Sequence, residues 1–220
     1  MSRVRKALCA AAGAGLLLIG ASVAVARPSH PAPASDLAGA VASSEARDLA
    51  AWVVSSRDPR GRAFALVDKK AARLYVFTPQ GRLAGASAVL LGLAVGDRAK
   101  PGIGDLPPSR IPAADRTTPA GRFATEPGSN LDGDAVVWFD YAAGLAIHRL
   151  RPDASERARS RRLATEDPRA HRVSAGCIVV PVPFFESVVL KWLGHRRGVL
   201  YVLPEVEPVE QVFADLDRDL

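Results

Sequence analysis

The stretch AFALVDKKAARLYVFTP, residues 63–79, holds two short apolar runs separated by a charged reversal at Lys69-Lys70-Ala71. Each run is either continuously apolar or alternating and ends at turn residues, which is typical of β-strands. A third apolar run at 81–96 follows another turn signal, Pro79-Gln80-Gly81. These three segments predict a β-meander rather than an alternation of strands and helices.

The rest of the chain adds strands around this meander and helices at its margins. Strands are expected at 135–141, 144–150, 173–181 and 198–205, and helices at 45–58, within 153–172, at 183–194 and at 208–220. Ser43 or Ser44 can cap the first helix, and Gly194 can end the third. The proline-rich segment 97–122 is expected to be a long ordered loop, a kind of segment that often carries function. The predicted fold class is mainly β, a sandwich or small barrel with peripheral helices.

The N-terminal region reads as an export signal. A short basic segment precedes an apolar run, and Ala24-Val25-Ala26 has the form of a signal-peptidase site, so residues 1–26 are expected to be a signal peptide cleaved after Ala26. A retained membrane anchor is the alternative. Residues 27–42 are rich in proline and alanine and are expected to be a tether, and 43–220 to be one domain.

Loss of the signal peptide would leave Cys177 as the single cysteine, because Cys9 lies within residues 1–26. A lone cysteine in an exported protein indicates an intermolecular link or a reactive thiol, whereas a buried small hydrophobe is the plain alternative. A reactive thiol needs a nearby base or cation. His148, at the end of an apolar strand, is the first candidate for that base, and His171, expected in an exposed loop, is the second.

The residues around Cys177 also suit acyl chemistry. Gly176 permits backbone conformations that orient consecutive N–H groups toward an oxyanion, and Ser174 can hydrogen-bond within the same turn; a glycine-marked bulge is the alternative. A zinc site from His148, His171 and Cys177 is disfavoured because these residues lack short paired spacings.

The segment from Arg149 to Arg172 contains eight arginines and four acidic residues. Their run lacks interleaved aromatic residues and follows an export signal, so nucleic acid is not an expected partner. These arginines form either a solvated helix face or a set of contacts to the carboxylates of an acidic substrate.

Together these residues resemble the catalytic domain of the YkuD-type L,D-transpeptidases, which cross-link bacterial cell-wall peptides through a cysteine. The family's histidine at a strand end and its later Ser-x-Gly-Cys segment correspond to His148 and to residues 174–177, and DRTTPAGRF at 115–123 matches its Thr-Pro-x-Gly-x-Phe stretch. The similarity covers about residues 60–205. Three positions depart from the family, which usually carries His or an aromatic residue at Ala175, Arg or Asn at Val179, and often Gly or Ser directly after the histidine, where this chain has Arg149.

The resemblance implies an L,D-transpeptidase-like β-sandwich and an exported cysteine acyltransferase of the periplasm or cell envelope, working as a monomer without metal or organic cofactor. The expected enzyme would act on peptidoglycan stem peptides and release D-alanine. The acceptor of the acyl group would be a further stem, a lysine of a wall-anchored lipoprotein or water. The alternatives are an L,D-carboxypeptidase-type hydrolase and a non-catalytic wall-binding homologue. The expected site comprises Cys177 as nucleophile, His148 as general base, the Gly176 backbone at the oxyanion hole, and Ser174, Arg172, Arg149 and His171 as substrate contacts.

Overall fold

The computed structural model describes residue 37 and residues 40–153 and 155–214. The chain separates into two compact units, Met1–His30 and Pro31–Leu220, and all described residues belong to the second. The expected signal peptide and most of the expected tether therefore lie outside the described residues. Among the helices that are described, none is both long and apolar enough to cross a membrane.

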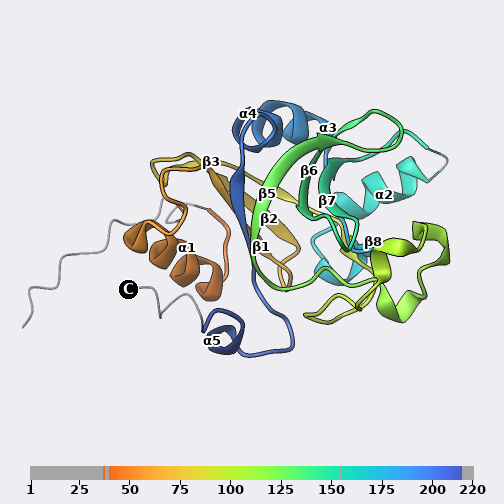
Figure 1. The fold of residues 1–220 in the computed structure, drawn as a ribbon, viewed down its shortest axis with the longest axis horizontal. Coiled ribbons are helices and arrows are strands. Elements are labelled where there is room, and N and C mark those ends of the chain that lie inside the picture. Colours follow the sequence, from red (N-terminus) through yellow and green to blue (C-terminus); the bar gives the residue numbers. More distant parts are fainter. Residues whose placement is uncertain (1–36, 38–39, 154, 215–220) are drawn as a thin grey trace, which may run out of the picture. The chain divides into compact units, whose positions relative to one another are not determined.

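An eight-stranded mixed sheet forms the body of the described unit, in the order β3-β2-β1-β10-β5-β6-β7-β9, beside a two-stranded β4-β8 sheet (Figure 1). The meander predicted from 63–79 and 81–96 is confirmed, since β2 pairs antiparallel with both β1 and β3. Two parallel pairings, β1 with β10 and β7 with β9, join segments distant in sequence. The strands are β1 Phe64–Asp68, β2 Arg73–Phe77, β3 Leu83–Ala88, β4 Leu91–Gly92, β5 Gly121–Ser129, β6 Ala135–Asp140, β7 Leu145–Arg149, β8 Arg172–Ser174, β9 Ile178–Val180 and β10 Gly198–Val202.

The two ends of the long sheet share one apolar core. Val67 and Leu74 from β1 and β2 belong to the same buried cluster as Ile147 and Ile178 from β7 and β9. An isolated bridge between Leu90 and Val179 also ties the chain that follows β3 to strand β9. The sheet therefore encloses its own core, and the predicted mainly β, sandwich-like class with peripheral helices is confirmed.

Helices cover the margins of this sheet. Helix α1 starts after Ser43, whose hydroxyl accepts the Ala46 N–H at 3.1 Å, and it buries Leu49 and Val53 in a second core with Phe64 and Tyr201 from β1 and β10. The expected helix at 183–194 begins one residue early and includes a π-helical turn, Phe185–Val189. The helices are α1 Ser44–Ser56, α2 Glu156–Leu163, α3 Val182–Phe184, α4 Leu190–Leu193 and α5 Val209–Val212.

The end of the expected tether is part of the folded unit. Leu37 is fully buried in the core under α1, and the Tyr75 hydroxyl donates to the Val41 carbonyl at 2.7 Å. These described residues of the expected tether pack against the domain, and the boundary at residue 43 stays a prediction. Their apolar side chains complete the α1 core, a tertiary contact that proline and alanine content does not reveal.

Strand β5 was not expected: the sequence predicted a loop through residue 122 and placed the next strand at 135. The first half of β5 pairs with β10 and its second half, from Glu126 on, pairs with β6. Each half pairs along one side only, and a strand of this kind accommodates a proline such as Pro127 when its nitrogen faces the unpaired side. The preceding loop is ordered around three short 3₁₀ helices: Ile103–Asp105, Pro108–Arg110 and Ala113–Asp115.

Candidate active site

Cys177 lies in the tight connection between β8 and β9, where Gly176 is required. Gly176 has a φ of 128°, and a Cβ atom there would lie 2.7 Å from the Thr117 carbonyl oxygen and 2.8 Å from Cδ2 of Leu145. Any side chain would therefore be both strained and obstructed. The glycine lets the chain turn sharply against the 115–123 segment and present the cysteine at the start of a core strand.

Ser174 fixes this connection from within. Its hydroxyl donates to the Cys177 carbonyl at 2.6 Å and accepts the Gly176 N–H at 3.0 Å, as the expected hydrogen bonding within the turn requires. The Gly176 N–H is consequently engaged and is not the free donor for an oxyanion. In the described part of the chain the Cys177 N–H donates to no protein acceptor, so the available oxyanion donor is the amide of the cysteine itself.

The Cys177 thiol is free and partly buried beside strand β7. Its Sγ lies 3.8 Å from the Gly144 carbonyl oxygen. Burial raises the pKa of the Cys177 thiol, and this effect outweighs the opposing influence of the Ala146 N–H and the Arg151 guanidinium. The resting site at neutral pH therefore holds a protonated thiol, which needs a base at the moment of attack.

His148 lies on β7 next to the strand that Cys177 begins. In the parallel β7–β9 pairing Ile147 faces Ile178 and His148 faces Val179. The His148 Nδ1 is 2.8 Å from the Arg149 carbonyl oxygen, and because a carbonyl only accepts, Nδ1 carries the proton and Nε2 keeps its lone pair. Within the described residues no hydrogen bond joins the imidazole to the thiol.

Burial keeps the His148 imidazole neutral. It lowers the pKa of His148 to about 4, helped by the charges of Arg151 and Arg159 and opposed by the Arg149 carbonyl. A neutral imidazole on β7, the strand paired with the one that follows Cys177, can act as a general base. The site holds no preformed imidazolium–thiolate pair.

His171 does not lie in an exposed loop, contrary to expectation. It is 3% exposed, with Nδ1 2.9 Å from the Val89 carbonyl oxygen and Nε2 3.2 Å from that of Thr165. Of the basic neighbours that suggested exposure, Arg169 is exposed, whereas the Arg172 side chain is only 11% exposed. The His171 ring is therefore structural and is not accessible to a substrate.

The arginines expected to contact substrate are engaged within the protein. Arg149 pairs with Asp134 at 2.8 Å, and Arg172 pairs with the buried Glu205. Arg151, which the sequence reasoning did not single out, is instead the guanidinium that acts on both Cys177 and His148. The sequence feature that could have identified Arg151 is its position three residues after His148.

Ala175 and Val179, two of the three positions that depart from the family pattern, differ in environment. Val179 is 3% exposed and packs with Leu90 and Leu150 in a small apolar cluster. Ala175 is partly exposed within the turn. A valine therefore matches the surroundings of position 179, where a polar side chain would have to be buried.

Several solved structures resemble this fold, two of them from Xylanimonas cellulosilytica DSM 15894 and E. faecium. Both are L,D-transpeptidase domains. The crystal structure of the L,D-transpeptidase from Xylanimonas cellulosilytica DSM 15894 is 17% identical with a TM-score of 0.39, and the match covers 64% of this chain and 60% of that one. The NMR structure of the catalytic domain from E. faecium L,D-transpeptidase is 19% identical with a TM-score of 0.33, over 65% of this chain and 98% of that one.

Similarity at this level does not assign an activity to the chain. The match spans less than two thirds of the first of these structures. No family model matches the sequence, and no curated protein matches it. The functional argument therefore rests on the residues of the site itself.

Proposed function

We propose that this chain is a cysteine acyltransferase of the L,D-transpeptidase type that acts on peptidoglycan stem peptides. The observation that carries the proposal is that the paired strands β7 and β9 and the turn before β9 supply a partly buried thiol, a neutral imidazole and a cysteine amide. Among the described residues the imidazole Nε2 and the cysteine N–H have no hydrogen-bond partner. Nucleophile, base and oxyanion donor are the three groups that acyl transfer through a thioester requires. The Ser-x-Gly-Cys and Thr-Pro-x-Gly-x-Phe segments support the same assignment.

In the proposed reaction the Cys177 sulfur attacks the amide that joins the L-centre of a stem-peptide diamino acid to its terminal D-alanine. The S–C bond forms as the thiol proton passes to Nε2 of His148, and the Cys177 N–H donates to the oxyanion. The C–N bond then breaks, the imidazole returns the proton to the leaving amine, and D-alanine departs from a thioester. An acceptor amine attacks the thioester carbonyl and gives its proton to His148. The C–S bond then breaks, and His148 passes that proton to the sulfur, which restores the thiol.

Arg151 takes the substrate-facing role that was expected of Arg149 and Arg172. Its charge acts on both site residues, and its side chain is 39% exposed with only a long 3.4 Å contact to Asp132. An exposed guanidinium at this place can pair with a carboxylate of the stem peptide.

Acylation by a carbapenem tests the proposal directly. The mature protein is expected to gain the mass of one carbapenem molecule, and Cys177→Ala, which removes the sulfur with little change in volume, is expected to gain none. Circular dichroism of both proteins serves as the folding control. A correctly folded wild-type protein without any adduct would overturn the acyltransferase assignment and leave the non-catalytic wall-binding homologue.

The acceptor separates transpeptidation from hydrolysis of the same bond. With a synthetic tetrapeptide stem as donor, a transpeptidase yields the cross-linked peptide when a second stem is supplied, whereas a carboxypeptidase yields only the trimmed stem. Muropeptide composition of cells with and without the protein extends the test to the wall and to protein lysines. Export by the signal at residues 1–26 belongs to this proposal, and shortening of the secreted chain after Ala26 is the measurement for it.

A further inference from the structure

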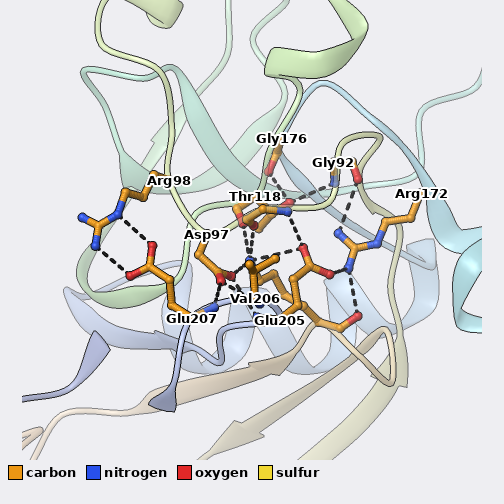
Figure 2. A network of polar contacts seen from close by, with 11 residues as sticks. Gly92, Asp97, Arg98, Thr118, Arg172, Gly176, Glu205, Val206 and Glu207 are labelled. Carbon is orange, nitrogen blue, oxygen red and sulfur yellow. Dashed lines mark hydrogen bonds and ion pairs between the residues drawn. The ribbon is translucent and has the colours of Figure 1, made fainter. Parts of the chain in front are cut away.

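Thr118 connects the loop before β5 to the cysteine turn. It is fully buried, and its hydroxyl donates to the Gly176 carbonyl at 2.8 Å and accepts the Gly92 N–H at 2.9 Å (Figure 2). Both hydrogen-bonding functions of the hydroxyl are thus used on backbone groups. Gly176 and Gly92 belong to segments far from Thr118 in the sequence, so this one side chain joins three parts of the fold.

The bond to Gly176 determines where the Cys177 amide points. The Gly176 carbonyl and the Cys177 N–H belong to the same planar peptide unit and point in opposite directions in a trans peptide. Holding the carbonyl oxygen on Thr118 therefore aims the Cys177 N–H away from Thr118. The next peptide is held in the same way, because the Ser174 hydroxyl donates to the Cys177 carbonyl.

Thr118 is itself held by a buried charged network. Lys69 Nζ donates to the Thr118 carbonyl at 2.9 Å and to Asp97 at 2.6 Å, and both side chains are almost completely buried. Asp97 also accepts the backbone N–H groups of Glu205, Val206 and Glu207. Figure 2 shows this network continuing through Glu205 to Arg172. Such a satisfied network restricts the motion of the backbone that carries the threonine.

We propose that Thr118 is a positioning residue for the reaction at Cys177: its hydroxyl fixes the Gly176–Cys177 peptide so that the Cys177 N–H stands ready for the oxyanion. The proposal rests on the proposed acyl transfer. It predicts that loss of the hydroxyl slows attack on a carbonyl, which creates an oxyanion, and leaves alkylation of the same thiol unaffected, because displacement at a saturated carbon creates none.

The experiment compares Thr118→Val, which keeps the shape and loses the hydroxyl, with Thr118→Ser, which keeps the hydroxyl. Carbapenem acylation of Cys177 is expected to slow at least about tenfold in Thr118→Val and to recover to within about threefold of wild type in Thr118→Ser. Iodoacetamide alkylation is expected to stay within about twofold in both variants, since neither changes the environment of the sulfur. Thr118→Ala replaces Thr118→Val if the valine variant does not fold.

Thr125→Val is the matched control. Thr125 is also fully buried, and its hydroxyl accepts the Gly198 N–H at 3.0 Å, on strand β10 rather than in the cysteine turn. The Thr125→Val variant is expected to be less stable than wild type but to be acylated at the wild-type rate. Unchanged acylation in folded Thr118→Val, or an equal fall of acylation and alkylation, would overturn the positioning role while leaving the acyltransferase assignment in place.

A measurement that does not depend on acylation distinguishes the positioning role of Thr118 from the acyltransferase assignment. The amide order parameter of Cys177, measured by ¹⁵N relaxation, is expected to fall in Thr118→Val and to stay at the wild-type value in Thr118→Ser and Thr125→Val. Absence of a carbapenem adduct on wild type would reject the acyltransferase assignment alone. An order parameter that does not change in Thr118→Val would reject the positioning role whatever the adduct shows.

Discussion

The Nδ1 of His148 lies 2.8 Å from the carbonyl oxygen of Arg149, the residue that follows it in the chain. The backbone of β7 therefore sets the tautomer of the imidazole, so the site needs no carboxylate to orient its base. Burial meanwhile lowers the pKa of His148 to about 4 and raises that of Cys177. The resting pair is neutral, and this has consequences for rate and stability.

The pH dependence of acylation is the first consequence. Because His148 is unprotonated above about pH 5 and the thiol is protonated well beyond neutrality, the reactive pair has a constant population between them. The acylation rate is expected to be flat from about pH 5.5 to 8.5 and to fall as His148 becomes protonated near pH 4. In His148→Ala the rate should instead rise about tenfold per pH unit, since only the thiolate reacts. A wild-type inflection near the ordinary histidine pKa would contradict a buried neutral base.

Substitutions of His148 and His171 are expected to have different effects, the first on the acylation rate and the second on stability. His148→Ala should lose about 10²-fold or more of the acylation rate at pH 7, because it removes the general base. His171→Ala should acylate at nearly the wild-type rate per folded molecule but unfold at lower denaturant concentration, because it removes a buried ring that contacts the Val89 and Thr165 carbonyls. Mass spectrometry and urea titration give the two quantities. The reverse order of rates would reassign the base.

Stability is expected to fall at acid pH in two steps. The folded-state pKa of His148, about 4, lies below the ordinary value of 6.5, so the unfolded chain binds the extra proton and stability declines as pH drops from 6.5 to 4. This term is at most about 3 kcal/mol. Burial opposes ionisation of Asp97, but Lys69 and three backbone N–H groups lower its pKa to about 2, so its contribution is lost between pH 3.8 and 2. Urea titrations from pH 7 to 2 measure both steps, and His148→Gln should abolish the first alone.

The buried pair behind the site is expected to be essential for the fold. Lys69→Met should cost about 3–5 kcal/mol of unfolding free energy, because Asp97 would remain buried without its cation. Lys70→Met is the neighbouring control, since Lys70 pairs with Glu45 at the surface and should change stability by less than about 1 kcal/mol. If urea titrations gave equal losses of unfolding free energy for the two substitutions, the buried Lys69–Asp97 pair would not stabilise the fold.

Restoring a family-typical polar residue at Val179 is expected to harm this protein. Val179→Asn should cost about 1–3 kcal/mol, because the amide would be buried between Leu90 and Leu150. Val95→Asn, at a valine that is 67% exposed, should be nearly neutral. Denaturant unfolding checks the costs, and a faster carbapenem acylation in Val179→Asn would show that the valine limits the site.

Local patterns identified the elements that local rules govern. The meander, the capped first helix and the strand that carries His148 follow from apolar periodicity and turn residues within a few positions. Strand β5 was not predicted because it changes its pairing partner at Glu126. This arrangement accommodates Pro127, and it depends on strands that lie outside the local sequence. His171 was misplaced for a similar reason, since the groups that bury its ring and contact it, the Val89 and Thr165 carbonyls, lie outside the basic stretch 169–172 that suggested exposure.

The sequence by itself determined the mainly β class, the lone cysteine of the domain and the histidine that accompanies it, because strand periodicity and residue chemistry are local properties. Only the tertiary structure decided which groups are free to react. It engaged the Gly176 N–H with Ser174, left the Cys177 N–H without an acceptor among the described residues, paired Arg149 and Arg172 with acidic side chains and buried His171. Hydrogen bonding and desolvation depend on neighbours that are far away in the chain, so the protonation states of His148 and Cys177 emerge only when β7 and β9 are paired.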